Sequence, residues 1–265
     1  MLPFRKCYGG CNRWARRNGR RCRRRTGMST QVVGIIGSGK IGTDVARLAT
    51  AAGLQVAVSN SRGPESLSDL VEQLGPLATA ATSAGAARSA DIVVLALPLS
   101  AFRDLPAEAL AGKTVVDATN YYPQRDGQIA ELDAGRVTSS ELVQRALPEA
   151  RVVKALNTVD FIRLPALARP SDAADRTALP VAGDDLDAKA AVVAFLDAIG
   201  FDAVDAGSLS DGWRFQPGTP TFVAPYSTSA ESAGDDPARA FLEAVPVPVH
   251  AVRARELLAA ASRDR

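Results

Sequence analysis

Short apolar runs alternate with amphipathic segments along most of the chain. Runs of β-branched and aliphatic residues without regular polar alternation are typical of strands that are buried on both faces of a parallel sheet. The run at 91–97, which Pro98 ends, shows this pattern most clearly. We expect eight strands, at residues 32–36, 54–59, 77–82, 91–97, 113–118, 151–156, 178–182 and 201–205.

Amphipathic segments fill the intervals between these runs. We expect helices at residues 43–52, 64–74, 84–88, 138–146, 186–199, 237–245 and 249–263. Thr138 and Glu141 have the spacing of a capping box, which marks the start of a helix. Strands that alternate with helices in this way predict a doubly wound, mostly parallel α/β sheet of about eight strands.

The character of the chain changes after residue 211. Residues 213–220 are loop-like and partly aromatic, and only two short helices are expected beyond them. We therefore expect three parts: a non-globular leader at 1–27, a domain at 28–210, and a C-terminal extension at 211–265. The extension is too short for an independent domain, so we expect it to pack on the same domain.

A glycine-rich turn joins the first predicted strand to the first predicted helix. Residues 37–42 read Gly-Ser-Gly-Lys-Ile-Gly, which matches the dinucleotide-binding fingerprint G-x-G-x-x-G. Gly37 permits the tight turn, Gly39 lets the backbone approach a pyrophosphate, and Gly42 lets the helix pack closely on the strand. The unpaired N–H groups of the helix N-terminus favour the anion. The turn therefore predicts a Rossmann fold that binds a dinucleotide.

The end of the second predicted strand distinguishes NADP from NAD. NAD-specific proteins place Asp or Glu there to hold the ribose 2′-hydroxyl. This chain has Ser59, Asn60, Ser61 and Arg62 instead, and its next carboxylate is Glu65. Hydroxyl, amide and guanidinium groups suit a 2′-phosphate, to which Arg62 can donate two parallel hydrogen bonds. The sequence therefore predicts NADP.

Charge is distributed unevenly between the leader and the rest of the chain. Residues 1–27 hold ten of the 31 Lys and Arg residues and no acid, which leaves 21 basic residues against all 29 acidic ones. The leader has too few large apolar residues to fold alone, and we expect Met28 to be the natural start. The acidic body argues against nucleic-acid binding.

The positions of the cysteines and the hydropathy of the chain argue against a disulfide-stabilised or cysteine-dependent body and against a membrane-spanning protein. All three cysteines, Cys7, Cys11 and Cys22, lie in the leader, so the body has no disulfide framework and no cysteine nucleophile. No apolar run approaches the ~20 residues of a membrane helix. We expect a cytoplasmic protein without a membrane partner.

No metal-ligand cluster and no obvious general acid or base stands at the carboxyl ends of the predicted strands. The single histidine, His250, falls within the predicted helix 249–263. The other weak candidates are Tyr121, Tyr122, Lys154 and the isolated carboxylates Asp117 and Asp126. Alcohol oxidation needs such a group, whereas hydride exchange between two redox rings needs mainly their alignment. We therefore expect a planar redox acceptor.

Several segments of the chain resemble the F420-dependent NADP oxidoreductase family. This family transfers hydride between NADPH and a deazaflavin, and its fold is shared by the reductase domain of the STEAP metalloreductases. The matching segments are residues 34–42, 60–62, 94–98, 152–158, 181–185 and 205–209. Archaeal members have a His-Thr-Ile-Pro-like segment where this chain has Asn-Thr-Val-Asp at 157–160.

The resemblance implies a role for each matching site. Ser38, Lys40 and Ile41 would hold the pyrophosphate, and Ser61 and Arg62 the 2′-phosphate. Leu97 and Pro98 would flank the nicotinamide, and hydride transfer would occur near Asn157 and Thr158. The residues that we expect to bind the cofactor are Gly37, Ser38, Gly39, Lys40, Ile41, Gly42, Ser59, Asn60, Ser61, Arg62, Leu97, Pro98, Asn120, Ala155 and Asn157. A homodimer is expected on the same ground.

The sequence thus indicates an NADPH-dependent oxidoreductase that reduces F420 or a flavin-like small molecule. Two alternatives stay open. One is a reductase of a small imine or carbonyl compound, since pyrroline-carboxylate reductases have a similar N-terminal domain. The other is a protein that binds NADPH as a redox sensor without turnover.

Overall fold

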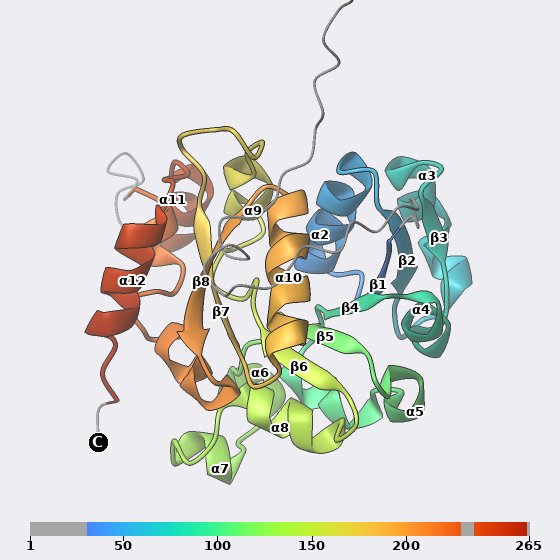
Figure 1. The fold of residues 1–265 in the computed structure, drawn as a ribbon, viewed down its shortest axis with the longest axis horizontal. Helices are drawn as coiled ribbons and strands as arrows, with labels where there is room; N and C mark the ends of the chain where they lie inside the picture. Colours follow the sequence, from blue (N-terminus) through green and yellow to red (C-terminus); the bar gives the residue numbers. More distant parts are fainter. Residues whose placement is uncertain (1–30, 229–235, 264–265) are drawn as a thin grey trace, which may run out of the picture. The chain divides into compact units, whose positions relative to one another are not determined.

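The computed structural model describes residues 31–228 and 236–263, so the leader lies outside the described residues. One eight-stranded sheet runs through the described part, in the order β3-β2-β1-β4-β5-β6-β7-β8 (Figure 1). The first six positions have the Rossmann order, and two further strands extend one edge. The strands are β1 (Val32–Ile36), β2 (Gln55–Ser59), β3 (Ala78–Ala80), β4 (Ile92–Leu95), β5 (Thr114–Asp117), β6 (Arg151–Lys154), β7 (Ala178–Gly183) and β8 (Asp202–Gly207).

The predicted doubly wound, mostly parallel sheet is confirmed. Strands β1 to β6 pair in parallel, and β7 pairs in parallel with β8. Only the β6–β7 pair is antiparallel, with Val153 opposite Gly183. The segment between these two strands carries one short helix, α9 (Arg163–Leu167), rather than a full crossover helix, and the chain therefore re-enters the sheet in the opposite direction.

Each central strand is buried on both faces. In β4, Ile92 and Val94 belong to one hydrophobic cluster, whereas Val93 and Leu95 belong to a second. Successive side chains of a strand point to opposite faces, so the two clusters lie on the two sides of the sheet. This is why the central runs are apolar without alternation.

Helices from distant parts of the chain cover these two faces. One cluster contains apolar residues of α2 (Lys40–Ala51), α10 (Leu186–Ala198) and α12 (Ala251–Ala260). The other contains residues of α5 (Ala107–Leu110) and α8 (Ser139–Ala146). The remaining helices are α3 (Ser68–Leu74), α4 (Ser83–Ser89), α6 (Pro123–Asp126), α7 (Ala130–Asp133) and α11 (Pro237–Glu243), with 3-10 turns η1 (Pro64–Leu67), η2 (Leu99–Asp104), η3 (Leu209–Phe215) and η4 (Ala224–Tyr226).

The ends of several helices differ from the prediction. Helix α2 begins at Lys40, three residues before the expected start, because Gly39 is its N-cap. The capping box of α8 is present: Glu141 N–H donates to Thr138 Oγ1 at 3.2 Å, and Thr138 N–H donates to the Glu141 carboxylate at 2.6 Å. The short helices between residues 99 and 133 were not predicted, since each is only one or two turns long.

The C-terminal segment packs on the added edge of the sheet. Ala254, Leu257 and Leu258 of α12 are buried in the same cluster as β7 and β8. His250 is the N-cap of α12 rather than a residue within the helix, and its side chain is exposed. Among the described residues, no helix combines the length and the apolar character needed to cross a membrane.

Candidate active site

Two adjoining cavities lie along the carboxyl ends of the central strands. The β1–β2 cavity, of about 450 Å³, is lined by the glycine turn, residues 60–62 and the segment after β4. The β5–β6 cavity, of about 300 Å³, is lined mainly by residues that follow β5 and β6. Gly39 and residues 96–98 line both cavities. Ligands of open α/β sheets bind at this edge.

The glycine turn has the shape that a pyrophosphate needs. Gly37 has a positive φ of 112°, and a Cβ there would collide with the Ala96 carbonyl oxygen. A Cβ at Gly42 would collide with the Gly37 carbonyl oxygen. At Gly39 no heavy atom lies within 4 Å of the position that a Cβ would take. Two glycines therefore permit close packing, and the third leaves open space before the N-terminus of α2.

Asn60 organises the loop after β2. Its Nδ2 donates to Ser38 Oγ at 3.2 Å and to Ser66 Oγ at 2.9 Å, while its Oδ1 accepts the Arg62 N–H at 2.9 Å. The Arg62 side chain is exposed at the β1–β2 cavity and has no ion pair among the described residues. Asp104, which is exposed, is the one carboxylate among the described lining residues. The guanidinium is therefore available to a 2′-phosphate.

Three of the expected site residues lie behind the cavities rather than in them. Ser59 is fully buried, and its hydroxyl donates to the Ile35 carbonyl at 3.0 Å. Ala155 is buried in the core, and the hydroxyl of the buried Thr158 donates to Tyr226 Oη at 3.2 Å. Every other residue expected to bind the cofactor lines at least one cavity, except Gly42, which packs against Gly37.

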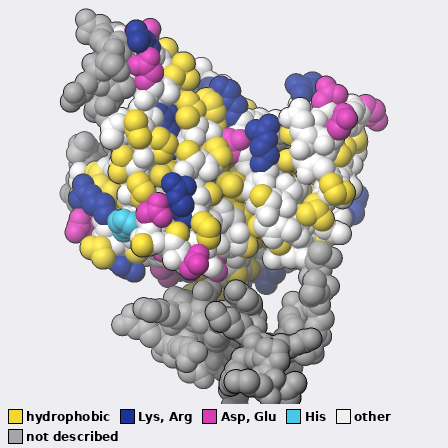
Figure 2. All heavy atoms as spheres, turned by 90° about the horizontal axis from the view of Figure 1, so that it is seen from above, with side chains coloured by type: hydrophobic (Ala, Val, Ile, Leu, Met, Phe, Trp, Pro, Cys, Tyr) yellow, Lys and Arg dark blue, Asp and Glu magenta, His cyan; other side chains and the backbone are white. Residues whose placement is uncertain are grey.

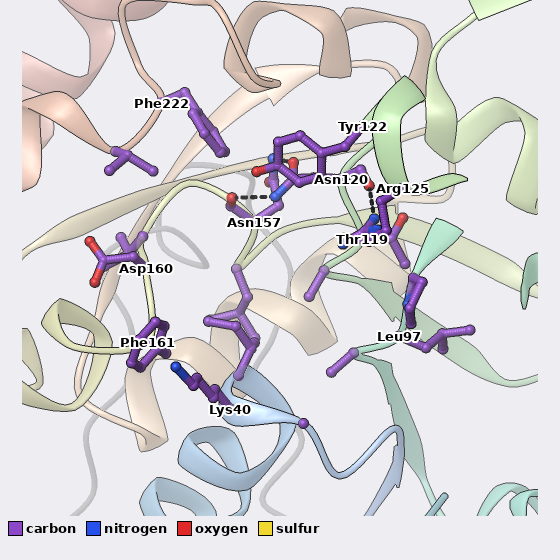
Figure 3. A pocket seen from close by; sticks show the side chains of 18 residues that line it. Lys40, Leu97, Thr119, Asn120, Tyr122, Arg125, Asn157, Asp160, Phe161 and Phe222 are labelled. Atoms are coloured by element: carbon purple, nitrogen blue, oxygen red, sulfur yellow. Dashed lines mark hydrogen bonds between the residues drawn. The ribbon is translucent and has the colours of Figure 1, made fainter. Parts of the chain in front are cut away.

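Two asparagine side chains meet in the β5–β6 cavity (Figure 3). Asn120 Nδ2 donates to the Asn157 carbonyl at 2.9 Å, and Asn157 Nδ2 donates to Asn120 Oδ1 at 3.1 Å and to the Phe215 carbonyl at 2.8 Å. Asn157 Oδ1 and Thr119 Oγ1 are buried and have no hydrogen-bond partner among the described residues. Buried polar atoms rarely stay unpaired, so a ligand that offers N–H groups would complete this wall.

A buried ion pair supports the loop that carries Asn120. Lys154 and Asp117 are both buried, with 3.2 Å between Nζ and Oδ2, and Lys154 Nζ also donates to the Thr119 carbonyl. Ser140 Oγ donates to the same carboxylate at 2.5 Å. Burial lowers the pKa of Lys154, although the neighbouring carboxylate opposes this. The expectation that Asp117 is isolated is therefore wrong, because its partners lie 37 and 23 residues away.

Asp126 is also paired, contrary to the expectation. Its carboxylate accepts hydrogen bonds from the Arg125 guanidinium at 2.8 Å and from the Tyr122 N–H at 2.9 Å. Burial raises the pKa of Asp126, but these bonds and one from the Ser100 N–H outweigh burial and lower it. Arg125 donates further to the Asn120 carbonyl at 2.7 Å. Asp126 and Arg125 therefore fix the loop after β5 rather than act as acid or base.

Aromatic side chains from three separate segments wall the β5–β6 cavity. They are Tyr122, Phe161 and Phe222, and Lys40 Nζ lies 3.8 Å from the centroid of the Phe161 ring. Figure 3 shows Phe222 and Tyr122 at one end of the cavity and Lys40 and Leu97 at the other. Phe161 and Phe222 were not predicted as site residues. Phe222 follows the aromatic segment 213–220, whose composition does not indicate where it folds, and no pattern in the sequence distinguishes Phe161.

The backbone of this cavity holds two residues in unusual conformations. Among the described residues other than glycine, only Leu156, with φ of 62°, and Val223, with φ of 53°, have positive φ. Both line the β5–β6 cavity. Such a residue costs on the order of 1–3 kcal/mol and persists only where its surroundings impose it. Residues of this kind cluster at ligand sites.

Two of the titratable side chains that line the β5–β6 cavity, Arg125 and Asp160, form ion pairs. Asp160 Oδ1 accepts hydrogen bonds from Arg163 Nη1 at 3.2 Å and from the Ile162 N–H at 2.9 Å, whereas Oδ2 is buried without a partner among the described residues, and the carboxylate turns away from the cavity in Figure 3. Lys40 Nζ contacts only the Phe161 ring, and the Tyr122 hydroxyl has no hydrogen bond among the described residues. Burial raises the pKa of Tyr122. The exposed His250 does not line either cavity.

No metal centre assembles in the described part of the chain, where no three His, Cys, Asp or Glu side chains converge. The face of the molecule in Figure 2 mixes basic and acidic side chains with apolar ones, and no continuous basic surface is visible on it. The two adjoining cavities along the strand ends, which together form one groove, are therefore the candidate active site.

Several known proteins are similar to this chain. Residues 32–121 match the family model of coenzyme F420-dependent NADP oxidoreductases. A hypothetical protein from Sinorhizobium meliloti has a similar structure, with a TM-score of 0.64 and 34% identity over 73% of this chain and 93% of that one. A candidate F420-dependent NADP reductase from Arthrobacter sp. FB24 has a TM-score of 0.56 and 28% identity over 68% of this chain and 86% of that one.

A metalloreductase, STEAP3 of Rattus norvegicus, is 31% identical over 180 residues. The alignment covers 67% of this chain, and it spans about a third of that curated relative, 34% of its length. The family match contains the glycine turn, the loop with Arg62 and the segment after β4, which together line the β1–β2 cavity. The part of the chain that contains the lining of the β1–β2 cavity, residues 32–121, thus belongs to the family of coenzyme F420-dependent NADP oxidoreductases.

Proposed function

We propose that the protein transfers hydride between NADP(H) and a planar redox acceptor, a deazaflavin of the F420 type or a flavin. The β5–β6 cavity carries this proposal, because aromatic and amide side chains wall it, Arg125 and Asp160 are ion-paired, and the Lys40 ammonium lies over the Phe161 ring. Such a cavity can hold a flat ring beside a nicotinamide at residues 96–98. Ring alignment is the main requirement of hydride transfer between two cofactors.

The dinucleotide occupies the β1–β2 cavity in this proposal. Its pyrophosphate lies at Gly39 and the N-terminus of α2, and its 2′-phosphate lies at Ser61 and Arg62. The nicotinamide lies at Leu97 and Pro98, which line both cavities and mark the place where the two cavities adjoin. NADPH loses one hydride, which consists of two electrons and one proton, and becomes NADP⁺. The acceptor ring gains that hydride and takes one further proton from water.

The direct test mixes the protein with NADPH and oxidised F420, and in parallel with FMN, and follows the absorbance of each acceptor. Bleaching of the acceptor in step with NADPH oxidation is expected. NADPH binding without reduction of either acceptor would overturn the proposal and favour the sensor alternative.

The unpaired hydroxyl of Tyr122 favours a second candidate, the reduction of a small imine or carbonyl compound. That reaction needs a proton donor at the substrate, and Tyr122 can supply one. We expect Tyr122→Phe to change turnover with F420 or FMN by less than about threefold, since general acid catalysis typically contributes a hundredfold or more. Turnover of an imine or carbonyl substrate whose kcat falls about a hundredfold in Tyr122→Phe would favour the second candidate.

The location and assembly of the protein are proposals as well. We propose a cytoplasmic homodimer in which residues 28–210 bind NADP and residues 211–265 pack on them. The resemblance to the family supports the dimer, and the burial of α12 on β7 and β8 supports the packing of the extension. Light scattering of the purified protein measures the assembly state, and a monomeric mass would contradict the dimer.

A further inference from the structure

The segment at Phe222 and Val223 closes the β5–β6 cavity from the C-terminal part of the chain. Val223 has φ of 53° and ψ of −59°, and the Ala224 N–H donates to the Phe222 carbonyl at 2.6 Å. These values describe a γ-turn with positive φ, which is rare and strained. A β-branched residue in this conformation is a clear outlier.

The surrounding structure forces this turn into place. The Val223 N–H donates to the Thr158 carbonyl at 2.9 Å, which ties the turn to the segment that follows β6. The Tyr226 N–H donates to the Val223 carbonyl at 3.0 Å, and the buried Tyr226 hydroxyl accepts the Thr158 hydroxyl. The turn is therefore held to Thr158, the residue after Asn157, both directly and through Tyr226.

The consequence of the strained turn is the position of the Phe222 side chain. Phe222 is half-buried and lines the cavity from the end opposite Lys40 and Leu97 (Figure 3). Gly39 and residues 96–98, which the dinucleotide would contact, are shared with the β1–β2 cavity, whereas Phe222 is not. Phe222 therefore faces the part of the cavity that the nicotinamide leaves free.

We propose that Phe222 is the platform against which the acceptor ring stacks, and that the strained turn at Val223 holds it there. This inference rests on the proposed function and names the structural class of the acceptor: a fused planar ring rather than a small imine or carbonyl compound. Offset stacking of aromatic rings adds binding energy beyond the buried area, so a flat acceptor gains from this residue and a small one does not.

The test measures ring binding separately from turnover. Quenching of F420 or FMN fluorescence in the presence of NADP⁺ reports the Kd of the acceptor ring, and NADPH titration reports the Kd of the dinucleotide. Phe222→Ala is expected to raise the Kd of the ring about tenfold while the Kd of NADPH changes by less than about twofold. Phe222→Trp, which keeps a flat surface, is expected to retain ring binding.

Val252→Ala is the control. Val252 lies on α12, is 67% exposed and lines neither cavity of the site, so this variant is expected to leave both Kd values unchanged. An unchanged ring Kd in Phe222→Ala, or an equal weakening of NADPH binding, overturns the inference. A wild type that binds neither ring overturns it as well.

A second variant tests the role of the strained turn. Glycine adopts positive φ without cost, so Val223→Gly relieves the strain but frees Phe222. We expect the ring Kd to rise while the Tm does not fall. A lower Tm with an unchanged ring Kd would show that the turn is structural only.

The outcomes separate this inference from the proposed function. If ring binding depends on Phe222 but no hydride is transferred, the inference is supported and the proposed function is wrong. If F420 or FMN is reduced but the ring Kd is the same in Phe222→Ala, the proposed function is supported and the inference is wrong.

Discussion

The Arg62 guanidinium lies exposed at the β1–β2 cavity, and Asn60 fixes the backbone that carries it. A hydrogen-bonded charge pair with a 2′-phosphate contributes on the order of 1.5–3 kcal/mol. Arg62→Ala is therefore expected to raise the Kd of NADPH by roughly tenfold to a hundredfold while the Kd of NADH barely changes. Fluorescence titration with each dinucleotide measures both values.

The control for this variant is Arg253→Ala on α12. Arg253 is exposed and pairs with Glu256, away from both cavities, so its removal should leave both dinucleotide affinities unchanged. Equal weakening of NADPH and NADH in Arg62→Ala would mean that Arg62 contacts a part that the two cofactors share. The assignment of the 2′-phosphate to Arg62 would then be wrong.

At the scale of elements, two glycines at the junction of β1 and α2 differ in role. Gly42 is needed for the helix to pack on the strand, and Gly39 is expected to matter for binding of the dinucleotide. Gly42→Ala places a Cβ against the Gly37 carbonyl, so α2 must move away from β1. Gly39→Ala places a Cβ in open space, and its φ of −71° suits alanine. The two substitutions are chemically identical and three residues apart, yet their surroundings differ.

We expect Gly42→Ala to lower the Tm by several degrees or more, because a domain of this size shifts by about 2–4 °C for each kcal/mol. Gly39→Ala is expected to keep the Tm within about 2 °C but to weaken NADPH binding at least tenfold, since its methyl group occupies the approach of the pyrophosphate. Thermal melts and NADPH titration of both variants check this. Unchanged NADPH affinity in a folded Gly39→Ala protein would contradict the position of the pyrophosphate.

At the scale of the whole molecule, Tyr226 is expected to make the free energy of unfolding fall at alkaline pH. Burial raises the pKa of Tyr226 to about 12, with the Thr158 hydroxyl acting in the opposite direction. The folded state holds this proton more tightly than the unfolded chain, whose tyrosines titrate near pH ~10. Its contribution, on the order of 2–3 kcal/mol, is therefore complete below pH ~10 and is lost as the pH rises to about 12.

Tyr226→Phe removes this dependence. The free energy of unfolding of the variant is expected to fall less steeply than that of the wild type between pH ~10 and ~12. The lowered pKa of Lys154 gives a slope of opposite sign, but it is present in both proteins and cancels in the comparison. Urea denaturation at a series of pH values measures both curves. Parallel curves would show that Tyr226 is not buried as a neutral phenol.

The sequence and the structure agree where local pattern determines the outcome. The eight strands were predictable because buried strands need continuous apolar runs, and α8 because Thr138 and Glu141 form a capping box. That residues 37–39 and 60–62 would lie together was predictable too, since each segment is contiguous in sequence and the two follow adjacent strands.

The β5–β6 cavity was not predictable, because the contacts that shape it join distant residues. Val223 donates a hydrogen bond to Thr158 across 65 positions, and Lys154 pairs with Asp117 across 37. The periodicity of the sequence does not predict such pairings. It does not predict the antiparallel pairing of β6 with β7 either. The charge of Asp117 and Asp126 was visible in the sequence, but their partners were not.

The lining shared by the two cavities has a kinetic consequence. Gly39 and residues 96–98 belong to both, so a dinucleotide in one cavity supplies part of the wall of the other. The acceptor would then meet a complete binding surface only after NADPH has entered, and it would have to depart before NADP⁺. Binding in this compulsory order predicts that NADP⁺ competes with NADPH, whereas the reduced acceptor inhibits noncompetitively against NADPH.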